Sequence, residues 1–364
     1  MMSQVVFGLI IVTAFLAAML ATFFMLHISH KLGLASQPNH RSSHNKVTPH
    51  GGGLGFVIVF LSALFLLFLF GHIDEIILAV FIGCGGVVAG IGLLDDIYPI
   101  AARWRFSAYL LAVTFGMVFL GGLPPVNIGN QLLDFGLFGD IGVVLLLLWW
   151  LNLYNFMDGI DALAAVEALS ILLGAVLLLW LGGETGSDVD NVNILLLLLF
   201  STVLGFLVWN CPPARIFMGD VGSTFLGFAL GMLAIISIAK GFLSPWVWMI
   251  LGSVFIVDST VTLLQRILKG ECWYEAHRSH AYQNATLRLI AYFETTKESV
   301  SEGARTKAHG IVSLCVLMIN ALWLLPLAYM AQSLPAWGSG IVLIAWLPLV
   351  LLAVYLGAGS NTTK

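Results

Sequence analysis

Apolar runs long enough to cross a bilayer recur along the whole chain, separated by short polar segments. A helix rises about 1.5 Å per residue, so roughly 20 apolar residues cross a hydrocarbon core. The ten-residue alternation typical of a membrane barrel is missing, and lipid-exposed backbone must satisfy its own hydrogen bonds. Each run therefore predicts a helix, and we expect an all-α, polytopic membrane helix bundle that forms a single domain over residues 1–364.

The pattern predicts eleven membrane-spanning helices. Their approximate ranges are residues 4–26, 52–71, 75–94, 106–122, 139–154, 163–182, 192–209, 223–239, 246–264, 310–331 and 338–357. The first run also resembles a signal peptide, but no Lys or Arg precedes Val5 and no small-residue cleavage site is obvious, so we interpret it as a span. Residues 265–309 are predicted to form the longest polar loop.

Composition excludes a soluble globule. Of the 364 residues, 60% are hydrophobic and only 9% are charged, whereas soluble domains carry roughly 25% charged residues. The four cysteines are scattered without C-x-x-C spacing, so no disulfide or zinc framework is implied.

Eleven spans place the chain ends on opposite sides of the membrane and sort the connecting segments into two sets. Fourteen of the 15 Lys and Arg residues fall in one set, and only Lys240 falls in the other. Because basic residues accumulate on cytoplasmic loops, the basic side is predicted to be cytoplasmic, with the N-terminus outside and the C-terminus inside. One missed span would mix the two sets, so the bias also supports the span pattern.

Under this topology, the unusual polar clusters all fall on the cytoplasmic face. They are RSSHNKVTPHGGG (41–53), LLDDIYP (93–99), NLYNFMDGID (152–161), NCPPARIFMGDVGS (210–223) and EAHRSHAYQ (275–283). The sequence therefore predicts an active site on one membrane surface.

Two adjacent carboxylates end the third predicted span. Asp95 and Asp96 directly follow an apolar Gly-Leu-Leu stretch, at a depth where an ionised carboxylate is costly without a cation, a partner or water. A helix end that reaches the lipid headgroups is the simplest interpretation. Paired carboxylates also suit divalent cation binding or a general base, and their charge opposes the dipole at the helix C-terminus. We predict catalytic roles for both residues.

Four oxygen-bearing side chains, Asn152, Asn155, Asp158 and Asp161, recur every three residues. Helix neighbours three apart share a face, and Gly159 is expected to end the helix and re-aim Asp161. Carboxylate and amide oxygens suit Mg²⁺, and they also bind the hydroxyl groups and imide edge of a nucleotide. A polar loop with Asp161 as the cap of the next helix is the alternative, but it leaves the other three unexplained.

The segment FMGDVGS places the Asp220 carboxylate between Gly219 and Gly222, with Ser223 at the predicted start of a span. Glycines let the backbone approach a ligand closely, and a helix N-terminus accepts phosphate. Arg215 supplies a cation for the same anion. An ordinary turn with a serine cap is the alternative interpretation.

The loop at 265–309 contains His277, Arg278 and His280. A third metal ligand at zinc spacing is missing, so a diphosphate clamp is favoured, because arginine matches phosphate oxygens bidentately. The rest of this loop, including residues 297–307, is interpreted as a solvated surface. Arg41 and His44 belong to a flexible cationic loop that membrane-surface electrostatics alone would also explain.

Taken in order, RSSH, TPHGGG, LLDD, NxxNFMDGID, PARIFMGDVGSTFLG and HRSHAYQ resemble the polyprenyl-phosphate N-acetylhexosamine-1-phosphate transferases, glycosyltransferase family 4. The resemblance covers nearly the whole chain, and HRSHAYQ is most similar to the branch that starts O-antigen or related surface-polysaccharide synthesis. The run of histidines typical of the peptidoglycan branch is missing. Ala162 stands where many members have glycine.

This resemblance implies transfer of a sugar-1-phosphate from a UDP-N-acetylhexosamine to undecaprenyl phosphate, with release of UMP. It implies a Mg²⁺ cofactor, with Mn²⁺ as a substitute, and a multi-pass protein of the bacterial inner membrane. Membrane lipid is a partner, nucleic acid is not expected, and a homodimer remains open.

The resemblance also implies roles for the predicted residues. Asp220 and Asn155 are expected to bind the metal, while Asp95 and Asp96 position or deprotonate the lipid phosphate. The remaining residues are expected to bind substrate: Asn152, Asp158, Asp161, Arg215, His277, Arg278, His280, Arg41 and His44.

Three alternatives remain at this point. A phospho-MurNAc-pentapeptide transferase belongs to the same family. An ion-coupled transporter also carries intramembrane acids, although its acids line the membrane midplane and its sequence often repeats. A binding protein without activity is the third, although loss of an acidic motif would be expected in it. The sequence does not name the sugar.

Overall fold

The computed structural model describes residues 4–36, 48–128, 131–183, 185–271, 278–296 and 301–360. The predicted site residues Arg41, His44 and His277 lie outside these ranges.

Helices make up most of the described chain, as predicted. In order they are α1 (Gln4–Ile28), η1 (Ser29–Leu32), α2 (Gly53–Leu69), α3 (Glu75–Leu78), η2 (Ala79–Gly85), α4 (Gly86–Ile97), α5 (Ala102–Leu120), α6 (Gly136–Phe156), α7 (Leu163–Gly182), α8 (Ser187–Asn210), α9 (Asp220–Ala239), α10 (Pro245–Leu251), α11 (Ser253–Leu268), α12 (Ala281–Thr295), α13 (Ser301–Ile319), η3 (Asn320–Leu324), α14 (Leu325–Ser333), η4 (Pro335–Trp337) and α15 (Gly338–Leu356).

Two short antiparallel pairs of strands complete the described elements. The first joins β1 (Ala35–Ser36) to β2 (Thr48–Pro49), and the second joins β3 (Val126–Ile128) to β4 (Gln131–Leu133). Neither pair contributes to the bundle core.

Eight of the described helices are long and apolar enough to cross a membrane, and a ninth span results if α10 and α11 are counted together. The protein is therefore a polytopic membrane protein. Every predicted span coincides with helix, but α2 has only 17 residues and α5 is not among the eight, so the count of eleven stays a prediction.

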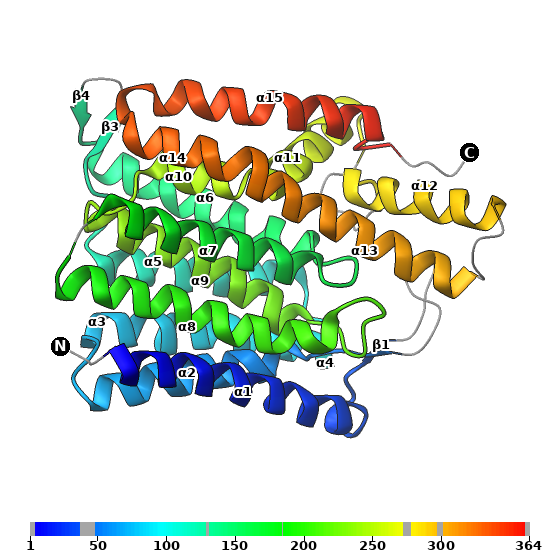
Figure 1. Ribbon diagram of the computed structural model, residues 1–364, viewed down its shortest axis with the longest axis horizontal. Helices are drawn as coiled ribbons and strands as arrows, with labels where there is room; N and C mark the ends of the chain where they lie inside the picture. Colours follow the sequence, from blue (N-terminus) through cyan, green and yellow to red (C-terminus); the bar gives the residue numbers. More distant parts are fainter. Residues whose placement is uncertain are drawn as a thin grey trace.

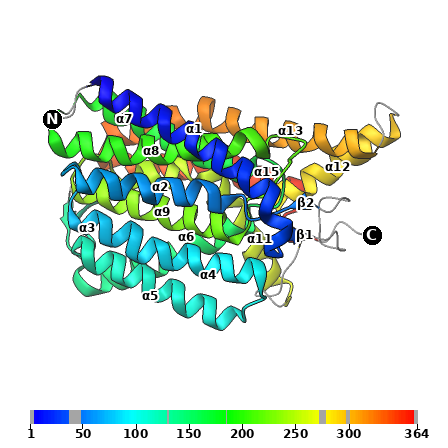
Figure 2. The same ribbon diagram turned by 90° about the horizontal axis from the view of Figure 1, so that it is seen from below.

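The helices run side by side, with α9 at the centre of the bundle between α4, α6 and α2 (Figures 1 and 2). Nearly every side chain of α9 is buried, including Phe225, Leu226 and Met232. A helix that is apolar on all faces suits such a central place, because every face can pack against a neighbouring helix. The polar groups at its N-terminus are thereby fixed by the surrounding helices.

Two predicted boundaries differ from the structure. The ninth predicted span, 246–264, is bent by 72° between α10 and α11, where a side chain on Gly252 would come within 2.9 Å of the Trp150 ring. The predicted loop 265–309 contains α12 and the first turns of α13, which project beyond the bundle at one end (Figure 1). The two helices pack against each other. This packing stabilises helical structure in a segment whose composition predicted a loop.

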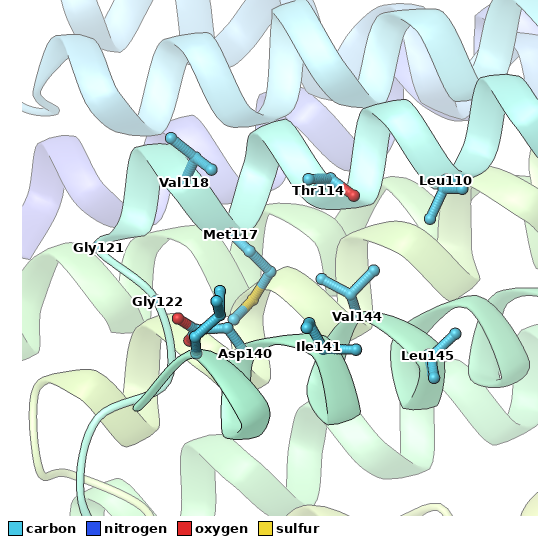
Figure 3. A pocket seen from close by; sticks show the side chains of 11 residues that line it. Leu110, Thr114, Met117, Val118, Gly121, Gly122, Asp140, Ile141, Val144 and Leu145 are labelled. Atoms are coloured by element: carbon cyan, nitrogen blue, oxygen red, sulfur yellow. The ribbon is translucent and has the colours of Figure 1, made fainter. Parts of the chain in front are cut away.

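A pocket of about 470 Å³ opens between α5 and α6 (Figure 3). Its walls are mainly apolar, and they include Leu110, Thr114 and Met117 from α5 and Ile141 and Val144 from α6. Asp140 lies at one end of the pocket, where it accepts a hydrogen bond from the backbone N–H of Leu123 at 2.6 Å.

Candidate active site

The predicted Asp-Asp pair meets the start of α9. Asp96, at the end of α4, accepts hydrogen bonds from the backbone N–H groups of Asp220 at 2.9 Å and Val221 at 3.1 Å. These donors have no partner within the helix, and a carboxylate placed there is also favoured by the helix dipole. Asp96 therefore fixes α9 relative to α4, and this brings Asp220 to the site.

Close backbone approach at this junction requires glycine. Gly219 has φ 77°, and a side chain on it would come within 2.7 Å of Asp96 Oδ2. A side chain on Gly92 would come within 2.6 Å of the Asp220 carbonyl oxygen. Glycine at these positions thus allows the ends of α4 and α9 to approach each other closely.

Asn155 joins the cluster from the last turn of α6. Its Nδ2 donates hydrogen bonds to Asp220 Oδ1 and to Ser223 Oγ, both at 2.9 Å. These bonds orient the amide, and none of the described residues donates to its Oδ1. The amide oxygen is therefore available to a ligand.

Arg105 is a site residue that sequence reasoning missed. From the first turn of α5 its Nη1 contacts Asp95 Oδ2 closely and donates to Asp220 Oδ2 at 3.2 Å. Asp95 also accepts a hydrogen bond from the backbone N–H of Ile100 at 2.7 Å, which holds the turn between α4 and α5. Arg105 follows Asp95 by only ten residues. Since α4 ends and α5 begins between them, both residues lie at the same end of the bundle, and this spacing could have identified Arg105.

His50 also reaches the site, although its loop was interpreted only as a cationic surface. Its Nε2 lies 3.1 Å from the Asp96 carbonyl oxygen and 3.9 Å from Asp96 Oδ1. The loop is held in place because Gly52 and Gly53 donate backbone hydrogen bonds to Phe217 and Met218. The glycine run of this loop thus packs against the segment that precedes α9.

Asp158 lies in the turn between α6 and α7, because α6 ends at Phe156. Withdrawal from water, followed by the negative charges of Asp220, Asp96 and Asp161, raises the pKa of the Asp158 carboxyl well above its ordinary range. Its carboxylate receives no hydrogen bond from any residue in the described part of the chain. Asp158 is thus a free oxygen donor beside the cluster.

The other two members of the polar stripe have local partners. Asn152 donates to the Leu148 carbonyl of its own helix at 2.7 Å. Asp161 is buried, accepts from the Ala214 N–H at 3.0 Å and lies 3.2 Å from His309 Nδ1. The cap of α7 is Ala162, in the left-handed region at φ 66°, so Asp161 does not cap that helix, contrary to the alternative interpretation.

Arg215 and His280 lie apart from the carboxylate cluster. Arg215 is exposed and stacks over the Trp209 ring at 5.5 Å. His280 is buried with its Nδ1 3.3 Å from Asp258 Oδ1. Arg215 contacts Trp209 and His280 contacts Asp258, and both contacts stabilise the fold around the site.

Asp258 fixes α12, a helix within the predicted loop 265–309, to α11. Its carboxylate accepts hydrogen bonds from the backbone N–H groups of Ala281 at 2.9 Å and Tyr282 at 3.0 Å. The Tyr282 hydroxyl then donates to the Phe156 carbonyl at 3.1 Å. Through this chain of contacts α12 lies against the turn that carries Asp158.

The donor atoms of the cluster fit Mg²⁺. No three His, Cys, Asp or Glu side chains of the described residues are arranged to hold one metal ion. Mg²⁺ is instead usually held by one or two carboxylates together with substrate phosphates and water. Asp220 and the unused oxygen of Asn155 provide such a partial set of oxygen ligands.

Comparison with known proteins gives one consistent family. Residues 78–238 match glycosyl transferase family 4. The chain is 29% identical over 301 residues to a probable undecaprenyl-phosphate N-acetylglucosaminyl 1-phosphate transferase of Bacillus subtilis (strain 168), and the match covers 80% of each chain. It is 26% identical over 288 residues to the undecaprenyl-phosphate alpha-N-acetylglucosaminyl 1-phosphate transferase of Escherichia coli (strain K12), with 75% of this chain and 74% of the relative covered.

A second kind of relative has similar identity. The phospho-N-acetylmuramoyl-pentapeptide-transferase of Sulfurimonas denitrificans is 28% identical over 298 residues, which cover 71% of this chain and 82% of the relative. The matched family region, 78–238, includes the whole carboxylate cluster described above, from Asp95 to Asp220.

Proposed function

The chain belongs to glycosyl transferase family 4, and we propose that it transfers an N-acetylhexosamine-1-phosphate from a UDP-sugar to undecaprenyl phosphate, releasing UMP. The observation that carries this proposal is the contact of Asp220 with both Asn155 and Arg105. These contacts bring the carboxylate of Asp220, the amide of Asn155 and the guanidinium of Arg105 together at one end of the helix bundle. A water-soluble donor and a lipid acceptor can meet at such a boundary.

We assign Mg²⁺ to Asp220 and the Asn155 oxygen, with Mn²⁺ as a substitute. When bound there, the metal would neutralise charge on the donor diphosphate. Asp158, which has no hydrogen-bond donor among the described residues, offers a third oxygen ligand to metal or nucleoside.

The acceptor phosphate is assigned to Asp95, Asp96 and Arg105. One of its oxygens attacks the sugar-bearing phosphorus of the donor, a new P–O bond forms, and the P–O bond to UMP breaks. A phosphate monoester has its second pKa near ~6, so the attacking oxygen already carries negative charge near neutral pH. Positioning by Arg105 therefore contributes more than removal of a proton.

The pocket between α5 and α6 suits the hydrocarbon chain of the acceptor (Figure 3). Leu110 in its wall follows Arg105 on α5 by about one and a half turns. A lipid with its phosphate at Arg105 can thus extend its chain into an apolar pocket without leaving the membrane.

We further propose that the active site faces the cytoplasm of a bacterium, with the N-terminus outside the inner membrane, because nearly all Lys and Arg residues fall on the same predicted side. The proposed donor is a UDP-N-acetylhexosamine, and an assay with several such donors identifies the sugar. The similarity to a pentapeptide transferase makes UDP-MurNAc-pentapeptide a necessary member of the donor panel.

Release of UMP by the purified protein tests the proposal. The assay contains undecaprenyl phosphate, Mg²⁺ and each donor in turn, with EDTA and the Asp220→Asn variant as controls. We expect lipid-dependent release with one UDP-N-acetylhexosamine, abolished by both controls. Release from no donor by a folded protein would reject the proposal, and release only from UDP-MurNAc-pentapeptide would assign the peptidoglycan reaction.

A further inference from the structure

The first turns of α13 form a second polar wall beside the Asp158 turn. His309 is 4% exposed and contacts Asp161 through Nδ1. Ser313, one turn further along α13, donates to the Asp161 carbonyl at 3.0 Å. These contacts fix the register of α13 against the turn between α6 and α7, and they determine where Arg305, four residues before His309, must lie.

Arg305 has a guanidinium group that is partly withdrawn from water, and two of its nitrogen atoms have no hydrogen-bond partner among the described residues. Its Nε and Nη1 atoms are buried, and no described residue accepts a hydrogen bond from them or forms an ion pair with the group. A buried guanidinium without an acceptor is costly, because desolvation is not offset by pairing. The position therefore calls for an anion that is supplied from outside the chain.

A second arginine lies near Arg305. Burial and the positive charge of Arg305 lower the pKa of Arg278, while Tyr282 opposes this shift. Two arginines near each other are unfavourable alone, and an anion between them removes the repulsion.

His309 adds a directed donor to the same wall. Its Nε2 is buried and has no hydrogen-bond partner among the described residues. Its Nδ1 lies 3.4 Å from the Asp161 backbone N–H, which donates to it. Because Nδ1 also lies 3.2 Å from Asp161 Oδ1, Nε2 is the ring nitrogen left for a ligand or for water.

We propose that Arg305 and His309 of α13 complete, with Arg278, an anion subsite that binds the diphosphate of the nucleotide-sugar donor. Tyr282 lies between this wall and the Asp158 turn, since a side chain on Gly159 would meet its hydroxyl group. The subsite thus borders the turn that carries Asp158 and Asp161. This inference rests on the proposed function for the identity of the donor.

The matched variants are Arg305→Gln, Arg305→Lys and Lys307→Gln, prepared in the full-length protein. Lys307 is an exposed cation on the same helix that stacks over the Phe293 ring at 5.5 Å, so its removal changes net charge equally without touching the subsite. Binding of UDP and of uridine is measured by calorimetry, and KM and kcat are measured for the donor and for undecaprenyl phosphate. Thermal unfolding of each variant checks the fold.

We expect Arg305→Gln to weaken UDP binding and to raise the donor KM by about ten- to a hundredfold, the range for a lost charge-assisted hydrogen bond. Uridine binding and the acceptor KM should stay unchanged, and the unfolding temperature without ligand should not fall, because the unpaired guanidinium is itself costly to bury. Arg305→Lys should recover part of the affinity, and Lys307→Gln should match the wild type.

Unchanged UDP affinity in Arg305→Gln would overturn the subsite, as would equal losses for UDP and uridine. Failure of the proposed function is a separate result, because it is absence of UMP release by the wild type. In that case the comparison of UDP with uridine still decides whether Arg305 binds a diphosphate. A wild type that binds no UDP overturns both.

Discussion

Asn155 donates from Nδ2 to Asp220 Oδ1 at 2.9 Å, although 65 positions separate the two residues. The same amide nitrogen donates to Ser223 Oγ, and no described residue donates to the amide oxygen. This contact joins the ends of α6 and α9, and it gives the proposed metal site one charged and one neutral oxygen ligand.

Replacement of Asp220 by asparagine should lower lipid-dependent UMP release by about 10²–10³-fold, the loss typical of removing one electrostatic group from an active site. The isosteric amide preserves shape, so the unfolding temperature should change little. Asp188→Asn is the control, because Asp188 is an exposed carboxylate paired with Lys240 at 3.0 Å. Full activity of Asp220→Asn, with Mg²⁺ still required, would contradict the assignment.

The Arg105→Gln variant should need less Mg²⁺ for half-maximal activity while its kcat falls. Removing a cation that contacts both Asp95 and Asp220 leaves the cluster more negative. The required concentration should drop by about two- to fivefold, as expected for a partly exposed charge pair. Arg103→Gln is the matched control, since Arg103 is exposed and stacks over Trp104. An unchanged Mg²⁺ dependence in Arg105→Gln would separate Arg105 from the metal site.

Filling the pocket between α5 and α6 should weaken the lipid acceptor alone. Thr114→Trp places a ring in the pocket, and exclusion of about two methylene groups at ~0.8 kcal/mol each raises the acceptor KM by about tenfold. The donor KM should not change, and a short-chain polyprenyl phosphate that does not reach the pocket should show no effect. Leu111→Trp, on the exposed face of α5, should behave as the wild type, and an equal loss in both variants would reject the pocket as the chain site.

Without metal, the protein should lose stability as the pH rises from the acidic range. The pKa of Asp158 is raised in the folded state, so its contribution to the free energy of unfolding is complete below the ordinary aspartate pKa of about 4 and is lost as the pH rises through the folded pKa. Asp158→Asn should flatten this decline, because the amide does not ionise. Unfolding temperatures in detergent with EDTA, measured across the acidic and neutral range, would show parallel curves if Asp158 were not responsible.

Much of the fold could be predicted from hydropathy, because lipid leaves the backbone no alternative to helix over an apolar run. The break at Gly252 and the order of α12 could not, since both depend on side chains from distant segments. Trp150 occupies the space beside Gly252, and Asp258 caps α12 from another helix. Neither contact could be read from the pattern of apolar and polar residues within the segment that it affects.

The residues of the candidate site also fall into those that the sequence indicated and those that only the structure showed. Asp95, Asp96, Asn155 and Asp220 were recognisable in the sequence, because acids and amides beside hydrocarbon are costly without a use. Arg105, His50, Arg305 and His309 were not, since a basic residue beside a membrane has an ordinary explanation in surface electrostatics.

The sequence by itself determined that the chain is a helical membrane protein and which acids and amides lie at the ends of its apolar segments, because lipid leaves an apolar run no alternative to helix. Only the tertiary structure decided which charges meet. The Asp95–Arg105–Asp220 bridge and the Asp161–His309 pair form where helix ends from separate parts of the chain come together. Coulomb attraction falls with distance in space, and separation along the chain does not reveal that distance.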